Sequence, residues 1–376
     1  MACISKALII GGSIAGLTAA IALARRGVKC DVVEIGDSHL GASLTLAGRA
    51  AMALVELGVY DQVRATGRPF LPDTTAASQS DSAGNLLSPG PSRPTYEGYV
   101  DPIAVYRPAF VDTLETIATD LGVTIRKNMT TKSIEDEGDR VSVVFQDDTT
   151  GQYDLVIGAD GIRSKTRTAF FPDAPSPTYA GQWSIRWMAP GPAVEPEGWY
   201  NSSVGRMAFY HMPVQGITYV PAVIDIPEPR RLSNEEIRER YTQLFDSFTA
   251  PAIVELRSRL TPESDVIAKA FDWILVPDTW VKGRVLLIGD AAHATTAHMG
   301  MGAGMAVEDS AVLGQCIETA SSLSEALETF MRRRYERVKM VVETSVKLCE
   351  LEQKNAPKSE NIALLTKAFG ALGQPY

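Results

Sequence analysis

Cysteine and positive charge are both scarce in this chain of 376 residues. The four cysteines lie far apart, and none belongs to the C-x-x-C pair of a zinc site or a redox dithiol. We therefore expect free thiols in a reducing cytoplasm and no bound metal. Lys and Arg number 36 against 45 Asp and Glu, giving a formal net charge of −9, which argues against a general nucleic-acid binder.

Long apolar runs are missing as well. The stretch 7–24 has the character of a signal peptide, but it contains a glycine-rich turn and is followed by a predicted strand, so we interpret it as part of the fold. No other apolar run approaches the length of a membrane span. With 45% hydrophobic and 22% charged residues, the composition predicts a soluble globular protein of one large or two modest domains. Its expected partners are small molecules, without nucleic acid or membrane.

The stretch Lys6–Glu34 has the pattern of a βαβ unit that binds a dinucleotide. A short apolar run meets a glycine-rich turn, a helical Ala/Leu stretch follows, and a second apolar run ends on Glu34. Gly11 permits a tight turn, Gly16 lets the helix pack closely on the strand, and Glu34 is placed to bind a ribose hydroxyl. The acid favours FAD or NAD over NADP. A βαβ unit without a nucleotide is the alternative, since Ser13 replaces the middle glycine of G-x-G-x-x-G.

Two later segments place polar groups at the ends of predicted strands. In Asp154–Arg167 a buried-looking run ends at Asp160 and Gly161. In Gly283–Leu313 another run ends at Asp290, and a glycine-rich loop then opens a helix. Parallel strands direct their carboxyl ends to one edge of a sheet, so we expect these residues to face the same crevice as the first turn.

The rest of the chain divides by its pattern. Residues 70–98, rich in Ser, Pro, Asp and Gly, predict loops with two short edge strands, whereas 172–272 are mostly β in character. We expect one helix over Ser233–Phe248, opened by an S-x-x-E capping box, and a long helix over Ser324–Gln353. The cluster Arg332–Arg334 is expected on a solvated face of that helix. The fold class is α/β, with a discontinuous Rossmann-like domain over 1–70, 100–170 and 280–320, a β-rich substrate domain over 71–99 and 171–279 inserted in it, and a C-terminal helical segment over 321–376.

Together, the three motifs resemble the single-component FAD-dependent monooxygenases that hydroxylate aromatic rings, the p-hydroxybenzoate and salicylate hydroxylase family. The resemblance covers nearly the whole chain, in order. It implies that the first turn and Glu34 hold the ADP half of FAD, Asp290 the ribityl chain, and Gly300–Gly304 the pyrimidine edge of the flavin. It also implies that Asp160 and Gly161 serve both FAD and the nicotinamide donor. The implied cofactor residues are Gly11, Ser13, Ile14, Ala15, Gly16, Glu34, Ala42, Ser43, Arg49, Arg107, Asp160, Gly161, Asp290, Gly300, Met301, Gly302 and Ala303.

The same resemblance implies the chemistry. NAD(P)H, docking transiently, would reduce FAD, O2 would add at the flavin C4a atom, and the resulting hydroperoxide would hydroxylate a phenolic or N-heteroaromatic small molecule. The residues themselves also point to an organic cofactor, because no side chain activates O2 unaided and the sequence has no metal-ligand spacing. Two alternatives stay open: an FAD-dependent reductase or epoxidase of a non-aromatic substrate, and a non-catalytic flavin-bearing protein that binds a ligand. The sequence decides neither NADH against NADPH nor monomer against homodimer.

The candidate catalytic residues are histidines and a tyrosine. His298 lies on the loop expected beside the flavin, where it acts either as a substrate base or donor or as a histidine bonded to loop carbonyls. His293 is expected to be structural. Strand alternation places Tyr210 and His211 on opposite faces, and each either meets the substrate or packs in the core. The chain departs from the resembled family at Ala297, Gly304 and Arg49, where proline, asparagine and asparagine are usual.

Overall fold

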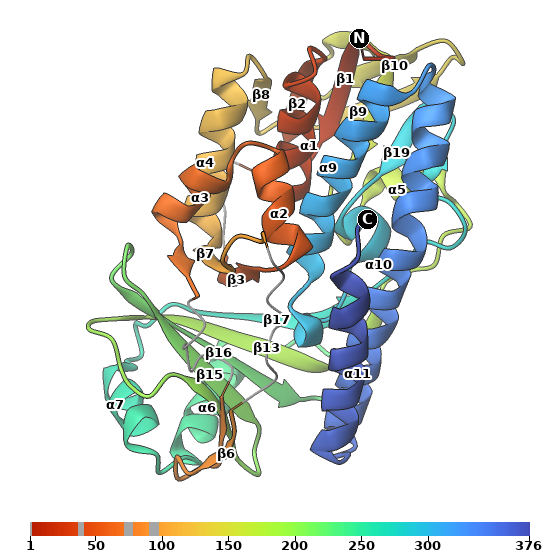
Figure 1. Cartoon of the computed structure of the whole chain (residues 1–376). Coiled ribbons are helices and arrows are strands. Elements are labelled where there is room, and N and C mark those ends of the chain that lie inside the picture. The colour runs from red at the N-terminus through yellow and green to blue at the C-terminus, as the bar shows by residue number, and fades with distance from the viewer. Residues whose placement is uncertain (1, 37–40, 71–77, 90–97) are drawn as a thin grey trace.

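The computed structural model describes residues 2–36, 41–70, 78–89 and 98–376. Its elements form two halves, each built on its own sheet (Figure 1). A long helix, α10 (Leu323–Gln353), runs along one side of both halves. The chain leaves the first half after strand β12 (Leu155–Gly158) and returns to it at β18 (Val281–Lys282) and β19 (Val285–Leu287).

A six-stranded sheet forms the first half. In spatial order its strands are β18 (Val281–Lys282), β19, β12, β1 (Lys6–Ile10), β2 (Lys29–Glu34) and β8 (Thr124–Lys127). All neighbours pair in parallel except β18 with β19. Strand β1 is almost continuously apolar because both faces of the sheet are covered.

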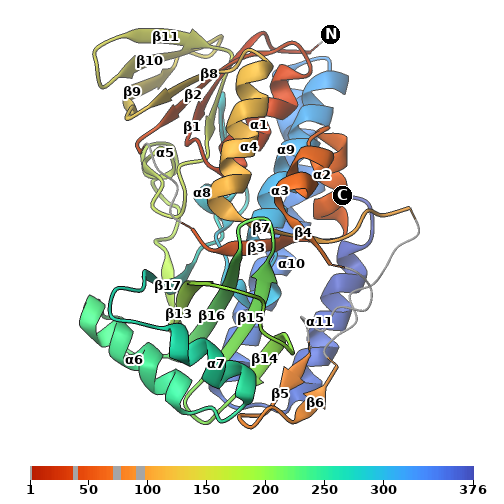
Figure 2. The ribbon, with the colours of Figure 1, turned by 90° about the vertical axis from the view of Figure 1, so that its left-hand side faces the viewer.

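The two faces of this sheet have different covers (Figure 2). Ala7 and Ile9 pack with helices α1 (Ile14–Ala24) and α9 (Gly302–Thr319). Leu8 and Ile10 pack instead with a three-stranded antiparallel sheet. That sheet consists of β9 (Thr131–Asp136), β10 (Val141–Phe145) and β11 (Thr150–Tyr153).

A seven-stranded, mostly antiparallel sheet forms the second half. In spatial order its strands are β17 (Val266–Trp273), β13 (Thr178–Pro190), β16 (Ile217–Asp225), β15 (Arg206–Met212), β14 (Gly198–Asn201), β5 (Gln79–Ser80) and β6 (Leu86–Ser88). Trp187 and Phe209 on one face form a core with helices α6 (Asn234–Asp246) and α7 (Pro251–Arg259). The other face is turned toward the first half.

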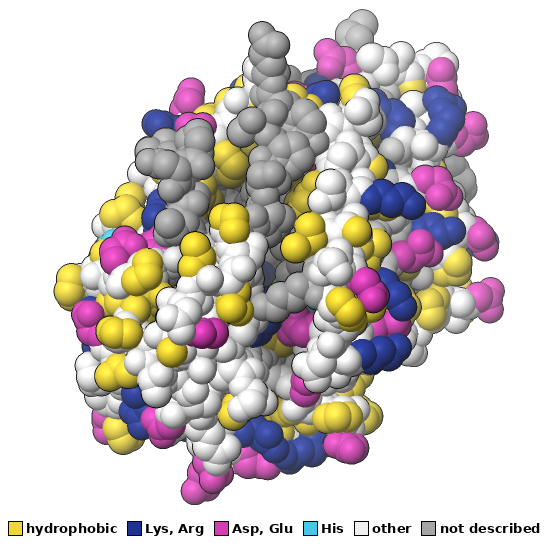
Figure 3. Space-filling model, turned by 60° about the horizontal axis from the view of Figure 1, so that its bottom comes forward, with side chains coloured by type: hydrophobic (Ala, Val, Ile, Leu, Met, Phe, Trp, Pro, Cys, Tyr) yellow, Lys and Arg dark blue, Asp and Glu magenta, His cyan; other side chains and the backbone are white. Residues whose placement is uncertain are grey.

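Smaller elements connect the halves. A three-stranded sheet of β3 (Ser43–Leu46), β7 (Ile103–Tyr106) and β4 (Arg68–Pro69) lies between the two large sheets (Figure 2). The remaining helices are α2 (Arg49–Glu56), α3 (Tyr60–Thr66), α4 (Arg107–Asp120), α5 (Lys165–Phe170), α8 (Asp290–His293), the 3-10 turn η1 (Ala297–Met299) and α11 (Lys358–Leu372). None of the helices in the described ranges combines the length and apolar character that crossing a bilayer requires. On the face shown in Figure 3, acidic and basic side chains are interspersed.

The α/β class with a Rossmann-like parallel sheet is confirmed. The capping box of α6 is also confirmed, because the Glu236 N–H donates to Ser233 Oγ at 3.1 Å and the Ser233 N–H donates to Glu236 Oε2 at 2.9 Å. The predicted long helix is present, and α11 lies within the predicted C-terminal helical segment. The prediction of one helix in 172–272 is wrong, because α7 follows α6 there. The solvated face predicted for Arg334 is wrong, since its side chain is fully buried in ion pairs. The loop predicted over 70–98 lies partly outside the described residues, and its described part contains β5 and β6.

Candidate functional site

Three loops leave the same edge of the first sheet. Strands β1, β12 and β19 are neighbours, with Ile10 beside Gly158 and Gly158 beside Leu287. Because these strands are parallel, the segments that follow them emerge side by side. The first glycine-rich turn, Asp160 and Asp290 are therefore brought to one place.

The turn after β1 is shaped by close backbone packing. Gly11 has a φ of +113°, and a Cβ there would strike the carbonyl of Ala159. A Cβ on Gly16 would strike the carbonyl of Gly11. The Gly12 N–H donates to Glu34 Oε2 at 2.6 Å, and the N–H two residues beyond Glu34 donates to its other oxygen at 3.1 Å. Only glycine fits at positions 11 and 16, and the Glu34 carboxylate borders the turn.

A cation lies against this turn. Arg107, the first residue of α4, donates from Nη2 to Ser13 Oγ at 2.9 Å. Burial lowers the pKa of the Arg107 guanidinium and the charge of Arg186 adds to this, while the carboxylates of Asp290 and Glu34 oppose it. Helix amides, a hydroxyl and a guanidinium are the groups that bind a pyrophosphate. The cradle fits the ADP half of a dinucleotide such as FAD.

Asp160 shapes its own loop. Its carboxylate accepts hydrogen bonds from Ser164 Oγ at 2.5 Å and from the Thr166 N–H and Oγ1, both at 3.0 Å. The backbone beside it is open, because a Cβ on Gly161 (φ +76°) would meet nothing within 4 Å. At this loop a ligand would therefore contact the Gly161 backbone more readily than the Asp160 carboxylate.

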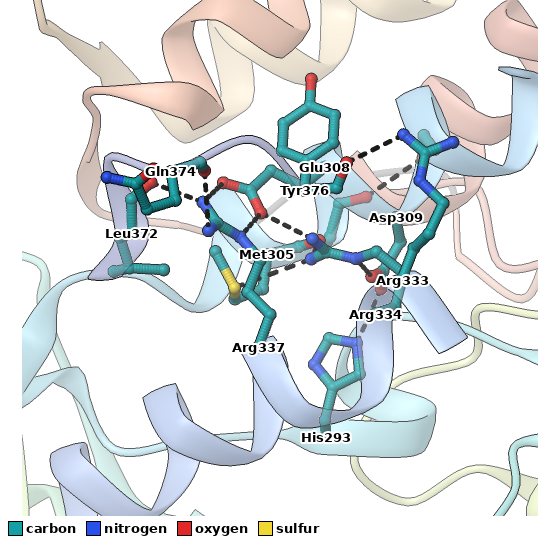
Figure 4. Close-up of polar contacts among 12 residues, drawn as sticks. His293, Met305, Glu308, Asp309, Arg333, Arg334, Arg337, Leu372, Gln374 and Tyr376 are labelled. Carbon is teal, nitrogen blue, oxygen red and sulfur yellow. Dashed lines mark hydrogen bonds and ion pairs between the residues drawn. The ribbon is translucent and has the colours of Figure 1, made fainter. Parts of the chain in front are cut away.

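Asp290 is exposed, and its turn is held from behind by α9. Asp309 Oδ2 accepts hydrogen bonds from the Gly289 N–H at 3.1 Å and from His293 Nε2 at 2.7 Å, which gives His293 a structural role. Asp309 Oδ1 accepts from Arg334 Nε at 2.8 Å (Figure 4). The position of the Asp290 carboxylate thus depends on a buried ion pair.

That ion pair belongs to a larger buried cluster (Figure 4). Arg334 Nη1 donates to Glu308 Oε2 at 2.7 Å, and Arg337 Nε donates to the same oxygen at 2.8 Å. Arg337 Nη2 also donates to the Leu372 carbonyl at 2.7 Å. The guanidinium charges of Arg334 and Arg337 balance the carboxylate charges of Glu308 and Asp309, so no charge within this cluster is left unpaired.

The cluster was missed in the sequence, although a signal was present. Glu308 and Asp309 interrupt the apolar helical run AVEDSAVL, where a buried acidic pair requires basic partners. The partners, Arg334 and Arg337, come from a different helix and could not be identified from spacing.

The loop before α9 combines a tight turn with polar atoms that lack partners. Gly300 has a φ of +63°, and a Cβ on Gly304 in the first turn of α9 would lie 2.9 Å from Ala50 Cβ of α2. Thr295 Oγ1, His298 Nε2 and Arg49 Nε are among the described polar atoms that are buried without a hydrogen-bond partner. Leaving such groups unpaired is unfavourable, so a ligand with a polar edge fits here. The flavin of FAD has such an edge.

The remaining predicted cofactor residues lie on neighbouring elements, and the Arg107 N–H donates to the Ala42 carbonyl at 3.1 Å. Ile14 and Ala15 open α1, Ala42 and Ser43 lie at the start of β3, and Met301, Gly302 and Ala303 lie where α9 begins. The described residues contain no group of three or more His, Cys, Asp or Glu side chains arranged to hold a metal ion.

The second sheet presents polar and aromatic side chains on the face opposite its core. Tyr210 and Tyr219 pack edge to face with ring centroids 5.3 Å apart. Burial raises the pKa of Tyr219, and the charge of Arg186 partly offsets this. On the same strand as Tyr210, Met212 Sδ accepts a hydrogen bond from Ser43 Oγ of β3 at 3.8 Å. This face therefore contacts strand β3, which carries the predicted cofactor residue Ser43.

The two predicted catalytic histidines have other neighbours than the Tyr210–Tyr219 pair. His211 points to the opposite side of β15 from Tyr210, with Nδ1 3.2 Å from a threonine hydroxyl. His298 is only 2% exposed, packs edge to face on Phe271 at 5.5 Å, and has Nδ1 3.0 Å from Thr296 Oγ1. Burial, aided by the charge of a nearby arginine, lowers the pKa of His298 well below its usual value, so the ring is neutral.

Comparison with known proteins adds to this geometry. The family described as FAD binding domain matches residues 5–345. Aurachin C monooxygenase/isomerase from Stigmatella aurantiaca is 30% identical over 351 residues, which cover 92% of this chain and 89% of that protein. FAD-dependent urate hydroxylase from Klebsiella pneumoniae (strain ATCC 700721 / MGH 78578) is 28% identical over 358 residues, covering 92% and 90%. Among solved structures, Klebsiella pneumoniae HpxO complexed with FAD and uric acid superposes with a TM-score of 0.78 at 22% identity, covering 99% of this chain and 93% of that chain.

Proposed function

Since the chain belongs to the FAD-binding domain family, and to the FAD-dependent monooxygenases within it, we propose that it uses NAD(P)H and O2 to hydroxylate a phenolic or N-heteroaromatic small molecule. The observation that supports this most is the contact between strand β3, which carries predicted cofactor residues, and the aromatic face of the second sheet. Ser43 of β3, one of the predicted cofactor residues, contacts Met212 on the face of the second sheet that carries Tyr210 and Tyr219. A substrate ring on that face is adjacent to the cofactor residues.

Each part of the cradle has a binding role in this proposal. The amides of the first turn, Ser13 and Arg107 bind the pyrophosphate, and Asp290 accepts a hydrogen bond from a ribityl hydroxyl. The loop Gly300–Gly304 binds the pyrimidine edge. Bound there, FAD supplies the electron transfer and oxygen activation that amino-acid side chains lack.

The second sheet supplies the groups that bind the substrate. Arg186 is a cation without an ion-pair partner among the residues the structure describes, and a nearby cation favours the ionised form of a phenol. Ionisation makes the ring more electron-rich and more easily hydroxylated. The pKa of Tyr219 is raised by burial, so its hydroxyl stays protonated and donates a hydrogen bond to a substrate oxygen. Tyr210 packs against Tyr219 and limits the positions the ring can take.

Support from the relatives concerns substrate class. Urate, named for the Klebsiella relative, is an N-heteroaromatic molecule that ionises readily. The pairing of a cation with tyrosine rings in this chain suits a planar, acidic ring of that kind. We propose that the substrate belongs to this class.

The test is a panel of hydroxylated and N-heteroaromatic compounds given to the FAD-loaded protein with NADH or NADPH. The proposal predicts that at least one compound accelerates NAD(P)H oxidation and yields a product one oxygen atom heavier. Reduction of a compound without oxygen incorporation would indicate a reductase instead. Tight binding without NAD(P)H oxidation across the panel would indicate a flavin-bearing binding protein.

A further inference from the structure

Arg49 has an unusual place beside the cofactor cradle. It is the first residue of α2, directly after Gly48, whose φ is +58°. The next residue, Ala50, touches the first turn of α9, because its Cβ would lie 2.9 Å from a Cβ on Gly304. Arg49 is therefore one residue away from the helix start assigned above to the flavin pyrimidine edge.

The charge of Arg49 has no counter-ion among the residues that the structure describes. Its Nε is buried without a hydrogen-bond acceptor, and it forms no ion pair with any residue in the described parts of the chain. The nearest defined partner is the ring of Tyr99, whose centroid lies 4.9 Å from the guanidinium carbon. Tyr99 is itself fixed, because its hydroxyl donates to the Gly373 carbonyl at 3.1 Å. A ring face attracts a cation but does not replace a hydrogen-bond acceptor for Nε.

Other arginines near the crevice differ in this respect. Arg68 pairs with Glu197 at 2.6 Å, and Arg206 pairs with Glu352 at 2.7 Å. Arg107 has a hydroxyl partner and lies within range of two carboxylates. Among the residues that the structure describes, Arg49 is thus the charged side chain on the cradle side whose buried N–H has no hydrogen-bond acceptor.

We propose that Arg49 donates a hydrogen bond to the pyrimidine edge of bound FAD, at C2=O and N1, and stabilises the negative charge that reduction places there. This inference rests on the proposed function only in taking FAD as the ligand and NAD(P)H as hydride donor. A hydride carries two electrons and one proton to the neutral flavin, so the reduced flavin has one negative charge, shared between N1 and C2=O. A cation in a partly dry site interacts strongly with such a charge. Arg49 therefore raises the reduction potential of the flavin.

An anionic group of the substrate is the other possible acceptor for Arg49. The two differ in when the interaction occurs. A flavin contact acts in the protein without substrate and depends on the redox state of the cofactor. A substrate contact changes only the binding of substrate.

The test compares three variants in the FAD-loaded protein without substrate: Arg49→Gln, Arg49→Lys and Arg64→Gln. Arg64 is exposed on α3, which packs beside α2, so its replacement controls for a general loss of positive charge. FAD affinity is measured by titration and the two-electron potential by reduction against a reference dye. For Arg49→Gln we expect an about tenfold weaker preference for the reduced flavin, which corresponds to a potential about 30 mV lower. Arg49→Lys should retain most of the wild-type potential, and Arg64→Gln all of it.

The outcomes separate this inference from the proposed function. An unchanged potential in Arg49→Gln, with or without weaker substrate binding, overturns the role of Arg49 at the flavin while leaving the monooxygenase proposal intact. An equal fall in Arg64→Gln also overturns it. If Arg49→Gln does not bind FAD, the Arg49→Lys variant is measured in its place. A potential near the wild-type value in Arg49→Lys supports the inference, and a tenfold weaker preference for the reduced flavin overturns it. A wild-type protein that binds no FAD would instead contradict the proposed function itself.

Discussion

Asp309 Oδ2 lies 2.7 Å from His293 Nε2, and through this contact helix α9 fixes the turn that carries Asp290. The same oxygen accepts the Gly289 N–H at 3.1 Å. Asp309 and His293 can therefore influence cofactor binding without contacting the cofactor. The turn that carries the exposed Asp290 carboxylate is held by Asp309 of α9, which is itself paired with the buried Arg334 of α10.

Replacing Asp309 with Asn should destabilise the protein strongly. The substitution leaves the buried Arg334 guanidinium only partly compensated, and breaking such a pair costs about 3 kcal/mol or more. Denaturant unfolding measures the change. The matched control is Glu318→Gln, which removes an exposed partner of Arg26 and should cost less than about 1 kcal/mol. Equal changes in the free energy of unfolding for the two substitutions would show that the buried cluster stabilises the protein no more than an exposed ion pair does.

Replacing Asp290 with Ala should weaken FAD binding without unfolding the protein. The ribityl hydroxyl loses its acceptor, at a cost of about 1–3 kcal/mol, or roughly 5- to 150-fold in Kd. Fluorescence titration with FAD gives the value. Asp173→Ala, another exposed acid, serves as the control and should leave the Kd unchanged. Undiminished FAD affinity in Asp290→Ala would remove Asp290 from the cofactor site.

Replacing Arg186 with Gln should affect the substrate rather than the cofactor. Loss of the cation disfavours the ionised ring, so we expect KM for an acidic phenol to rise about tenfold or more. KM for a neutral analogue should hardly change. Steady-state NAD(P)H oxidation with the two substrates measures the difference. A uniform loss with both would mean that Arg186 does not recognise charge.

The buried His298 predicts a pH dependence of stability. Its pKa is lowered in the folded state, mainly by burial, whereas the unfolded chain titrates near the ordinary value of about 6.5. Below that pH the unfolded state binds more protons than the folded state, so this contribution to stability is complete above about 6.5 and is lost as the pH falls. His298→Gln should flatten the dependence. The readout is the free energy of unfolding between about pH 5 and 8, and an equal slope in both proteins would refute the assignment.

The same variant tests whether His298 acts on the substrate. Its contacts with Phe271 and Thr296 place it in the support of the loop before α9. We therefore expect His298→Gln to slow flavin reduction and hydroxylation by similar factors in single-turnover experiments. A loss of about 100-fold confined to hydroxylation would instead identify it as the acid or base considered from the sequence.

The sequence predicts those parts of the molecule whose physics is local. Gly11, Gly16 and Glu34 define the βαβ unit because a tight turn and a strand end are set by near neighbours. The S-x-x-E pattern at Ser233 likewise locates the start of α6 correctly. Apolar runs without alternation identify the buried parallel strands, and so the fold class.

Features that depend on tertiary contacts could not be predicted from the sequence. Alternation separates Tyr210 from His211, but only the packing of α6 and α7 on one side of the sheet decides which of them faces the cradle. The burial of Arg334 depends on acids 25 and 26 residues away. The Asp160 carboxylate, placed toward the crevice by its strand end, is bonded to its own loop.

The proposed function requires that one oxygen atom pass from O2 to an aromatic ring by means of FAD. Mass spectrometry of the product formed under isotope-labelled O2, with the panel compound that most stimulates NAD(P)H oxidation, tests this transfer. We expect one labelled oxygen atom in each product molecule, and no label when only the water is labelled. A product that carries no label from O2 would show that the chain is not a monooxygenase for this compound.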